Sequence, residues 1–348
     1  MNFSKINIEL KKHNKNRLSK IVLTIYSCLL LPLSGIGQTI EKFSIDTGGA
    51  SVTTPTINLV YTIGEVNIAE RSSATIQISE GFLSCFIKIK INPKVFLQGA
   101  SLNPETTGLM NDDLRALGLL PTTSPFGDGK TVNASVFNLG GTSSLGAFKD
   151  DIVDWIWLEF RDETDVSNII KGTSVLLQRD GDVVALDGVS DISLGIVPKN
   201  YYIVLQHRNH LGVMSANPVA VTETGSAINF ISNTTATFGS NAQIALANGD
   251  LALWAGDTNA NGQIRFSGSD NDANIIKDAV LNDPSNGFNS ATYTSVGYLL
   301  IDVDLSGGGR FSGSDNDSNV IKDNVIQHPN NGFNSPTFTI STTVPVGN

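Results

Sequence analysis

Cysteine is almost absent from this chain. Its 348 residues include two cysteines, Cys28 and Cys85. Cys28 lies in an N-terminal segment that is expected to be removed, so the mature chain would keep Cys85 alone and form no internal disulfide. Bound metal is therefore the better candidate for a cross-link that stabilises the fold.

The chain also lacks a hydrophobic run long enough to cross a bilayer, which takes roughly 20 residues. Its most apolar stretch, residues 21–33, has 13 residues, with six basic residues before it and the small residues 34–37 after it. This arrangement is typical of a cleaved export signal over residues 1–37. We expect a secreted or cell-surface protein with no membrane span after cleavage; an uncleaved anchor is the alternative.

Basic residues are scarce relative to acidic ones. The chain has 23 lysines and arginines against 33 aspartates and glutamates, a net charge of −10. The predicted signal holds six of those basic residues and one acidic residue, so its removal leaves a net charge near −15. Such a charge opposes binding to nucleic acid or to an anionic membrane, and we expect neither partner.

Motifs for nucleophilic catalysis are missing as well. No Gly-x-Ser-x-Gly elbow occurs, since residues 141–146 (GTSSLG) fail at its last glycine. Two carboxylates would suffice for a glycosidase, but turns and metal loops already account for the many aspartates. We therefore expect that the protein is not an enzyme.

The most informative feature present is a repeat in the last third of the chain. Residues 256–294 recur 45 residues later as residues 301–339. Each copy opens with oxygen-bearing side chains at every second position and has a glycine in sixth place. These residues are Asp257, Asn259, Asn261 and Gly262 in the first copy, and Asp302, Asp304, Ser306 and Gly307 in the second.

This spacing is typical of a loop that wraps a calcium ion. Calcium takes roughly six to eight oxygen ligands, which such a loop supplies from positions 1, 3 and 5, a carbonyl at position 7, and a later carboxylate. Position 12 is a glycine in both copies, so the closing carboxylate is predicted at Asp272 and Asp317, with Asp270 and Asp315 as alternatives. The predicted ligands are Asp257, Asn259, Asn261, Gln263 and Asp272 in the first loop, and Asp302, Asp304, Ser306, Gly308 and Asp317 in the second.

Segments rich in Asp, Asn and Gly also form simple turns, but two copies with carboxylates in register favour calcium. An apolar run of helical spacing follows each loop, at residues 274–281 and 319–326. Asp272 and Asp317 are expected to cap these helices. We expect the second site to be weaker, because Ser306 replaces an amide and Gly309 replaces an apolar residue.

The apolar residues of the tail predict a small core. They are confined to the two helices and a few aromatics, namely Phe266, Phe288, Phe311 and Phe333. Ion binding should then contribute much of the folding free energy, and the tail is expected to fold only with metal.

The pair of loops and helices resembles the dockerin module over residues 251–340. The resemblance rests on the opening Asp-x-Asn-x-Asn-Gly and on the helix after the last aspartate. It implies two calcium units that pack together and interact with a protein partner. The chain departs from the dockerin pattern in two inserted segments, residues 265–268 and 310–313.

The remainder of the chain predicts a mainly β protein. Residues 38–90 form a small β-rich module with strands at 57–63 and 74–78, and the strings YTIGE and ISEGF resemble a module found at the start of Bacteroidetes-type surface proteins. Residues 91–250 alternate short apolar runs with turn residues, which favours an antiparallel β-sandwich. Its clearest strands are predicted at 153–161, 174–178, 182–186 and 201–207, with one helix at 111–117.

Four strings in residues 91–250 resemble a family called hemagglutinin-like in the same bacteria. They are VFLQGA at 95–100, GLMND at 108–112, LQRDGD at 177–182 and HRNHLGVM at 207–214. The resemblance implies adhesion without a defined ligand.

Two features of the predicted sandwich have a functional alternative. His207 and His210, with Asp180, Asp182 and Asp187, could hold a transition metal or act as a base. Trp155 and Trp157 share one face of a strand and could stack on sugar rings. We favour a structural role for the histidines and core packing for the tryptophans.

The sequence thus predicts an antiparallel β-sandwich, preceded by a small β module and followed by a small helical, dockerin-like calcium-binding module. We expect a noncatalytic protein that binds calcium and serves in adhesion or protein interaction. The alternative is an accessory component of polysaccharide degradation that binds glycan or docks to an enzyme complex.

Overall fold

A computed structural model describes residues 88–138, 149–232 and 234–348, and the backbone of four strands before them. These strands are β1 (Gly48–Thr53), β2 (Asn58–Ile63), β3 (Glu70–Ser72) and β4 (Gln77–Ser79), and they form the antiparallel pairs β1-β2 and β3-β4. The chain divides into two compact units, Met1–Gly64 and Glu65–Asn348. The predicted export signal, Cys85 and residues 141–146 lie outside the described residues.

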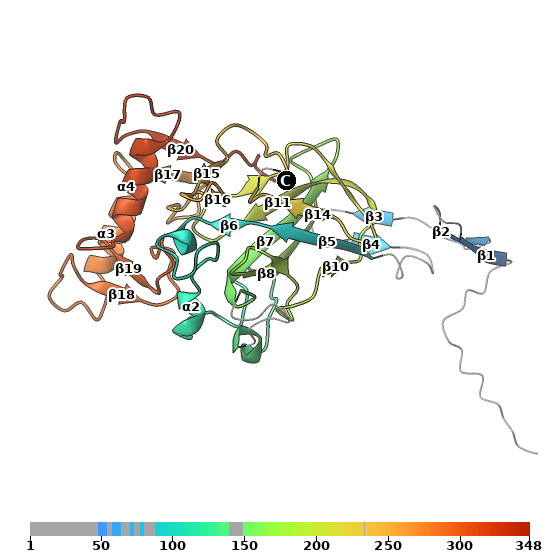
Figure 1. The fold of residues 1–348 in the computed structure, drawn as a ribbon, viewed down its shortest axis with the longest axis horizontal. Coiled ribbons are helices and arrows are strands. Elements are labelled where there is room, and N and C mark those ends of the chain that lie inside the picture. The colour runs from blue at the N-terminus through green and yellow to red at the C-terminus, as the bar shows by residue number, and fades with distance from the viewer. Residues whose placement is uncertain are drawn as a thin grey trace, which may run out of the picture. The chain divides into compact units, whose positions relative to one another are not determined.

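The largest sheet of the second unit has six antiparallel strands in the order β12-β11-β7-β8-β9, with β13 also paired to β11. Its central strands β11, β7 and β8 are labelled in Figure 1. Its strands are β7 (Ile152–Asp162), β8 (Ile169–Gln178), β9 (Val183–Val184), β11 (Lys199–Gln206), β12 (Val213–Met214) and β13 (Val219–Val221). The four strands predicted from the sequence correspond to β7, β8, β9 and β11. Trp155 is fully buried in β7, while Trp157 is half-buried.

Two three-stranded sheets, β10-β5-β14 and β15-β16-β6, share an apolar core with the large sheet. Their strands are β5 (Ile89–Lys94), β6 (Phe96–Leu97), β10 (Ile192–Leu194), β14 (Ala227–Asn229), β15 (Gln243–Ala245) and β16 (Leu251–Leu253). The β14-β5 and β16-β6 pairs are parallel, which the antiparallel prediction missed. The predicted boundary after residue 250 separates β16 from β15 and β6, although these three strands form one sheet.

Short helical segments connect the strands. They are the 3-10 helices η1 (Gly99–Ser101) and η2 (Ala134–Asn138) and the single-turn helix α2 (Asp113–Ala116), which lies within the helix predicted at 111–117. Among the described residues, none of the helices combines the length and the apolar character that a membrane crossing requires.

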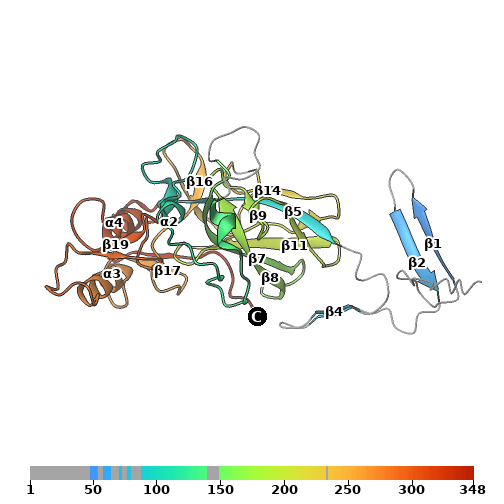
Figure 2. The same cartoon turned by 90° about the horizontal axis from the view of Figure 1, so that it is seen from below.

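The tail repeats the order of loop, short strand and helix. Its elements are β17 (Gln263–Arg265), α3 (Asp272–Leu281), β18 (Thr294–Val296), β19 (Gly308–Arg310), α4 (Asp317–Gln327) and β20 (Thr339–Ser341). The two predicted helices are confirmed, and they pack against each other (Figure 2). Ile276 and Val280 of α3 meet Ile321 and Val325 of α4 in one buried cluster, because residues four apart share a helix face.

The core of the tail differs from the sequence-based expectation. Leu211 and Trp254, which precede the repeats, belong to the same buried cluster as the two helices. Phe288 and Phe333, expected to contribute to this core, are 98% and 97% exposed. The tail therefore draws part of its apolar packing from the preceding β structure. Of its four predicted aromatics, Phe266 and Phe311 pack against the cluster, while Phe288 and Phe333 do not.

Candidate metal centre

The two repeats have the same loop backbone. Left-handed conformations occur at matching positions, with φ of 56° at Ala260 and 60° at Leu305, and 77° at Gly262 and 87° at Gly307. The two glycines therefore occupy the backbone region for which a sixth-position glycine is required.

Three carboxylates converge in the second loop. One oxygen from each of Asp302, Asp304 and Asp317 lies within 4.8 Å of the others. Asp302 and Asp317 are fully buried, and Asp304 is half-buried. Asp315, the alternative closing residue, is exposed in a left-handed conformation. The cluster could therefore hold a metal ion with Asp317 as its closing carboxylate.

Backbone amides aim two of these carboxylates into the loop. Asp302 accepts hydrogen bonds from the N–H groups of Ser306 (3.0 Å) and Gly307 (2.9 Å). Asp317 accepts from Val303 (2.5 Å) and Arg310 (2.6 Å). The backbone of the loop thus donates hydrogen bonds to the carboxylates of Asp302 and Asp317.

The prediction that the aspartates cap the helices was wrong by one residue. The N-caps are Asn271 and Asn316, whose side chains accept from the N–H groups of Asn274 (2.9 Å) and Asn319 (3.0 Å). Asp272 and Asp317 begin their helices, and their carboxylates bind loop amides instead.

The first loop has the same design with two carboxylates. Asp257 accepts from the N–H groups of Asn261 (2.9 Å) and Gly262 (2.8 Å). Asp272 accepts from those of Thr258 (2.9 Å) and Arg265 (2.8 Å). The remaining predicted side-chain ligands, Asn259 and Asn261, are exposed on the loop, and Gln263 follows at the start of β17.

Burial makes these carboxylates costly to ionise. It raises the pKa of Asp257 to about 6, and burial together with the charge of Asp304 raises the pKa of Asp317 to about 7. Burial and the charge of Asp317 hold the pKa of Asp302 well above its ordinary value. None of the ion pairs among the described residues involves Asp302, Asp304 or Asp317. A bound cation would supply the missing positive charge, so these residues fit a metal ion.

The second loop gathers more negative charge than the first. The second loop has three carboxylates and the first has two, and calcium affinity depends on the charge of the ligands. Gly309 does not leave the second loop unsupported, because a Cβ built there would lie 2.5 Å from Ile301 Cδ1. Ile301 thus fills the space beside Gly309, and we expect the second site to be the tighter one.

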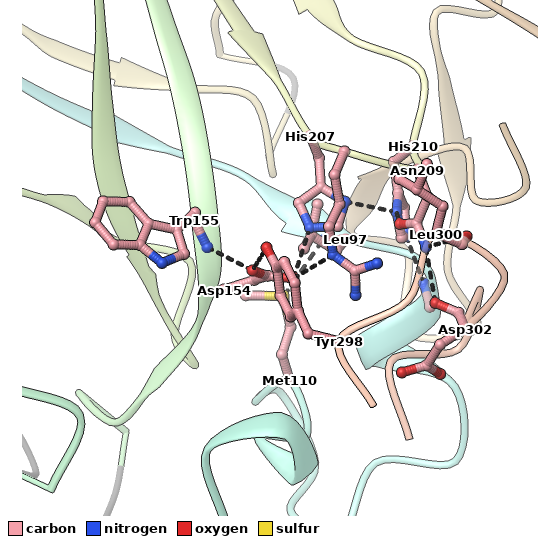
Figure 3. A network of polar contacts seen from close by, with 12 residues as sticks. Leu97, Met110, Asp154, Trp155, His207, Asn209, His210, Tyr298, Leu300 and Asp302 are labelled. Carbon is pink, nitrogen blue, oxygen red and sulfur yellow. Dashed lines mark hydrogen bonds and ion pairs between the residues drawn. The ribbon is translucent and has the colours of Figure 1, made fainter. Parts of the chain in front are cut away.

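A buried polar network joins the tail to the large sheet (Figure 3). Asp154 of β7 has no exposed surface, and its Oδ2 accepts a hydrogen bond from Arg208 Nε (3.1 Å). Its Oδ1 accepts from the hydroxyl of Tyr298 (2.6 Å), which lies between the two loops in the sequence. Burial alone would raise the pKa of Asp154, but Arg208 and His207 lower it to about 2. The carboxylate is therefore ionised and ties β7 to the tail.

Asn209 contacts the start of both loops. Its carbonyl oxygen accepts from the N–H groups of Gly256 (3.0 Å) and Asp257 (3.1 Å). Its side-chain Nδ2 donates to the carbonyl oxygens of Asp302 (2.7 Å) and Leu300 (3.0 Å). One residue thus positions the first ligand of each predicted calcium site.

The two histidines meet in the same network. Nδ1 of His207 lies 2.9 Å from Nδ1 of His210, and Nε2 of His207 lies 3.0 Å from Asp154 Oδ2. Nε2 of His210 accepts from the N–H of Gly99 (3.0 Å). Burial lowers the pKa of both imidazoles, which favours their neutral forms.

The aspartates that the sequence grouped with these histidines lie in other contacts. Asp180 pairs with Lys149 (2.7 Å), Asp182 pairs with Lys94 (2.6 Å), and Asp187 accepts from Ser190 in a turn. The histidines therefore contact Asp154, Asn209 and Gly99 instead. Sequence reasoning missed Asp154, Arg208 and Tyr298, and the only signal was the string HRNH at residues 207–210.

The tryptophans of β7 make internal contacts. Nε1 of Trp155 donates to the carbonyl of Pro121 (2.9 Å). Nε1 of Trp157 donates to Glu159 Oε1 (2.8 Å), and its ring lies 5.9 Å from that of Phe126. Trp155 therefore packs in the core. Trp157 is half-buried beside Phe126.

Comparison with known proteins finds no family, no curated protein and no solved structure that matches this chain.

Proposed function

We propose that this chain is a noncatalytic, secreted or cell-surface protein that binds calcium through its two C-terminal loops and serves in adhesion or protein interaction. The buried three-carboxylate cluster of the second loop carries this proposal, and the first loop repeats its hydrogen bonds with two carboxylates. Calcium binds proteins through hard oxygen ligands such as these carboxylates.

The first ion would be held by Asp257, Asn259, Asn261, the carbonyl of Gln263 and Asp272. The second would be held by Asp302, Asp304, Ser306, the carbonyl of Gly308 and Asp317. Each ion supplies positive charge to carboxylates that are otherwise buried together. Because Asn209 binds the start of both loops, ordered loops would also be held firmly against the large sheet.

The architecture supports the same reading. The large sheet and the two three-stranded sheets, β10-β5-β14 and β15-β16-β6, cover a common core. This is the arrangement of a β-sandwich. The two loop-and-helix units pack through α3 and α4, as the dockerin resemblance implies. A protein partner that binds the repeats is part of the proposal.

Calcium binding is tested by calorimetric titration of the full chain after removal of metal. We expect two binding events, and magnesium should bind more weakly because it demands a smaller, near-octahedral shell. Absence of heat with calcium, or tighter binding of magnesium, would overturn the assignment.

Adhesion is tested with the same protein on an array of immobilised glycans and proteins, with calcium and with excess chelator. The matched control is the Asp302→Asn/Asp317→Asn variant, which keeps the side-chain shapes but removes two charges. We expect binding that is lost in chelator and reduced in the variant. A ligand retained equally under all three conditions would show that the calcium loops have no part in adhesion.

A further inference from the structure

A cavity of about 450 Å³ lies beside the second loop, between the segment that follows β6 and helix α4. Amides and carboxylates dominate its lining, with Asn103, Asn111, Asp113, Asn319 and Asp323 among them. Asp304 and Ser306, predicted calcium ligands at positions 3 and 5, lie in its wall. None of the described residues that line it is a lysine, an arginine or a histidine.

We propose that this cavity binds a neutral sugar, one of whose hydroxyl groups reaches the calcium ion of the second loop. The inference rests on the proposed calcium site and names the ligand class that the site would recognise. It places ligand recognition at the junction of the tail and the β structure, away from the tryptophans of β7.

The second loop leaves room in the coordination shell. Calcium takes roughly six to eight oxygens, and Asp302, Asp304, Ser306, Gly308 and Asp317 supply about six if Asp317 binds through both oxygens. The remaining positions suit water or a ligand hydroxyl. Because Asp304 and Ser306 line the cavity, a ligand held there lies on the side of the loop from which the ion can be reached.

Charge and coordination chemistry together decide between the classes of ligand. Asp113, Asp315 and Asp323 would repel an anion that entered the cavity. A cation would be attracted by these carboxylates, but it cannot enter the coordination shell of calcium, which takes oxygen ligands. A sugar hydroxyl accepts metal through its oxygen and donates its hydrogen to a carboxylate, so a neutral polyol satisfies both neighbours. The asparagine amides add donors and acceptors for further hydroxyls.

The inner wall of the cavity is held in place without a ligand. Gln98 Nε2 donates to Asn324 Oδ1 (2.6 Å), and Asn324 Nδ2 donates back to Gln98 Oε1 (2.8 Å). Asn324 Nδ2 also donates to the carbonyl of Ala255 (2.8 Å). A wall ordered in advance reduces the entropy that binding must overcome.

The repeat provides matched variants for the test. Asp323 on α4 lines the cavity, while its counterpart Asp278 on α3 does not. Asn103→Gly gives a second probe, since the φ of 46° at Asn103 suits glycine and the change removes the side chain alone. Its control is Asn334→Gly, at a left-handed asparagine (φ 50°) outside the cavity.

The experiment titrates the calcium-saturated full chain with methyl α-mannopyranoside, methyl α-fucopyranoside and methyl β-galactopyranoside, observed by amide NMR. We expect one of these sugars to shift the resonances of Ser306, Gly307 and Asn319. Asp323→Ala and Asn103→Gly should each weaken that sugar by about fivefold or more, as loss of a hydrogen bond does. Asp278→Ala and Asn334→Gly should leave it unchanged.

Calcium affinity is measured on every variant by calorimetry, and we expect it to be unaltered, because none of the four residues is a predicted ligand. Sugar-independent spectra with intact calcium binding would overturn the inference and leave the calcium sites standing. Failure of calcium binding would overturn the proposed function first. L-arginine methyl ester is the competing probe, and its binding to the same residues in place of sugar would show a cationic partner and contradict the inference.

Discussion

Exchanging one carboxylate between the two loops should reverse their calcium affinities. Position 3 is Asp304 in the second loop and Asn259 in the first. Both loops have left-handed backbone conformations at the matching fourth and sixth positions. Asp304→Asn therefore leaves the second loop with two carboxylates, and Asn259→Asp gives the first loop three.

The size of the effect follows from the geometry of the second loop. Carboxylate oxygens within 4.8 Å of one another repel by about 3 kcal/mol per pair or more at an effective dielectric constant near 20. Calcium carries twice the charge and lies roughly 2.4 Å from each ligand oxygen, so its attraction for Asp304 exceeds this repulsion. Lost hydration of the half-buried Asp304 offsets most of the difference. We expect Asp304→Asn to weaken the second site by about 1.4–3 kcal/mol, or roughly ten- to hundredfold.

Calorimetry of the full chain measures the two affinities, and NMR assigns them to loops. The amides of Gly262 and Gly307 report each site, because each donates to the first carboxylate of its own loop (2.8 and 2.9 Å). In the unmodified protein Gly307 should respond first, and in the double exchange Gly262 should. An unchanged order after the exchange would refute the argument from ligand charge.

Three other predictions concern the same region. Burial raises the pKa of Asp257 to about 6 and of Asp317 to about 7, so both carboxylates bind protons more tightly in the folded than in the unfolded chain. The calcium-free protein should therefore lose stability to urea as the pH rises from about 4 to 7, and calcium should bind more weakly and release protons as the pH falls. Flat pH profiles would contradict this. Asp154→Asn leaves Arg208 buried without its carboxylate and should cost about 3–5 kcal/mol of unfolding free energy in urea. The control is Asp162→Asn, also on β7, which breaks a more exposed ion pair with Lys199 of β11 and should cost about 1 kcal/mol or less. Equal losses would argue against the network. Gly99→Ala places a Cβ 2.1 Å from the carbonyl oxygen of Val303, so it should cost about 1–3 kcal/mol and weaken the second calcium site; Gly287→Ala, which meets nothing within 4 Å, is the control, and an equally harmless Gly99→Ala would contradict the close packing.

Local patterns in the sequence predicted local structure well. The 45-residue repeat located both loops and both helices, and alternation of apolar residues located β7 and β11. The N-caps were misplaced by one residue because Asp and Asn are both good caps, and only the hydrogen bonds show that Asp272 and Asp317 serve the loop.

Features that depend on distant residues could not be predicted from periodicity. Parallel pairing of β6 with β16 joins segments more than 150 residues apart, and no local signal marks it. The contact of Asp154 with Tyr298 spans 144 residues. Phe288 and Phe333 were placed in the core by hydrophobicity alone, whereas Leu211 and Trp254 from outside the repeats pack against the helices instead.

The most direct test of the account is the number of calcium ions bound per chain, measured by elemental mass spectrometry after equilibrium dialysis. The full chain should bind two ions. Asp257→Asn/Asp272→Asn and Asp302→Asn/Asp317→Asn should each retain one, and the combined variant should retain none. A full chain that binds no calcium, or a combined variant that still binds two ions, would contradict the assignment of these loops.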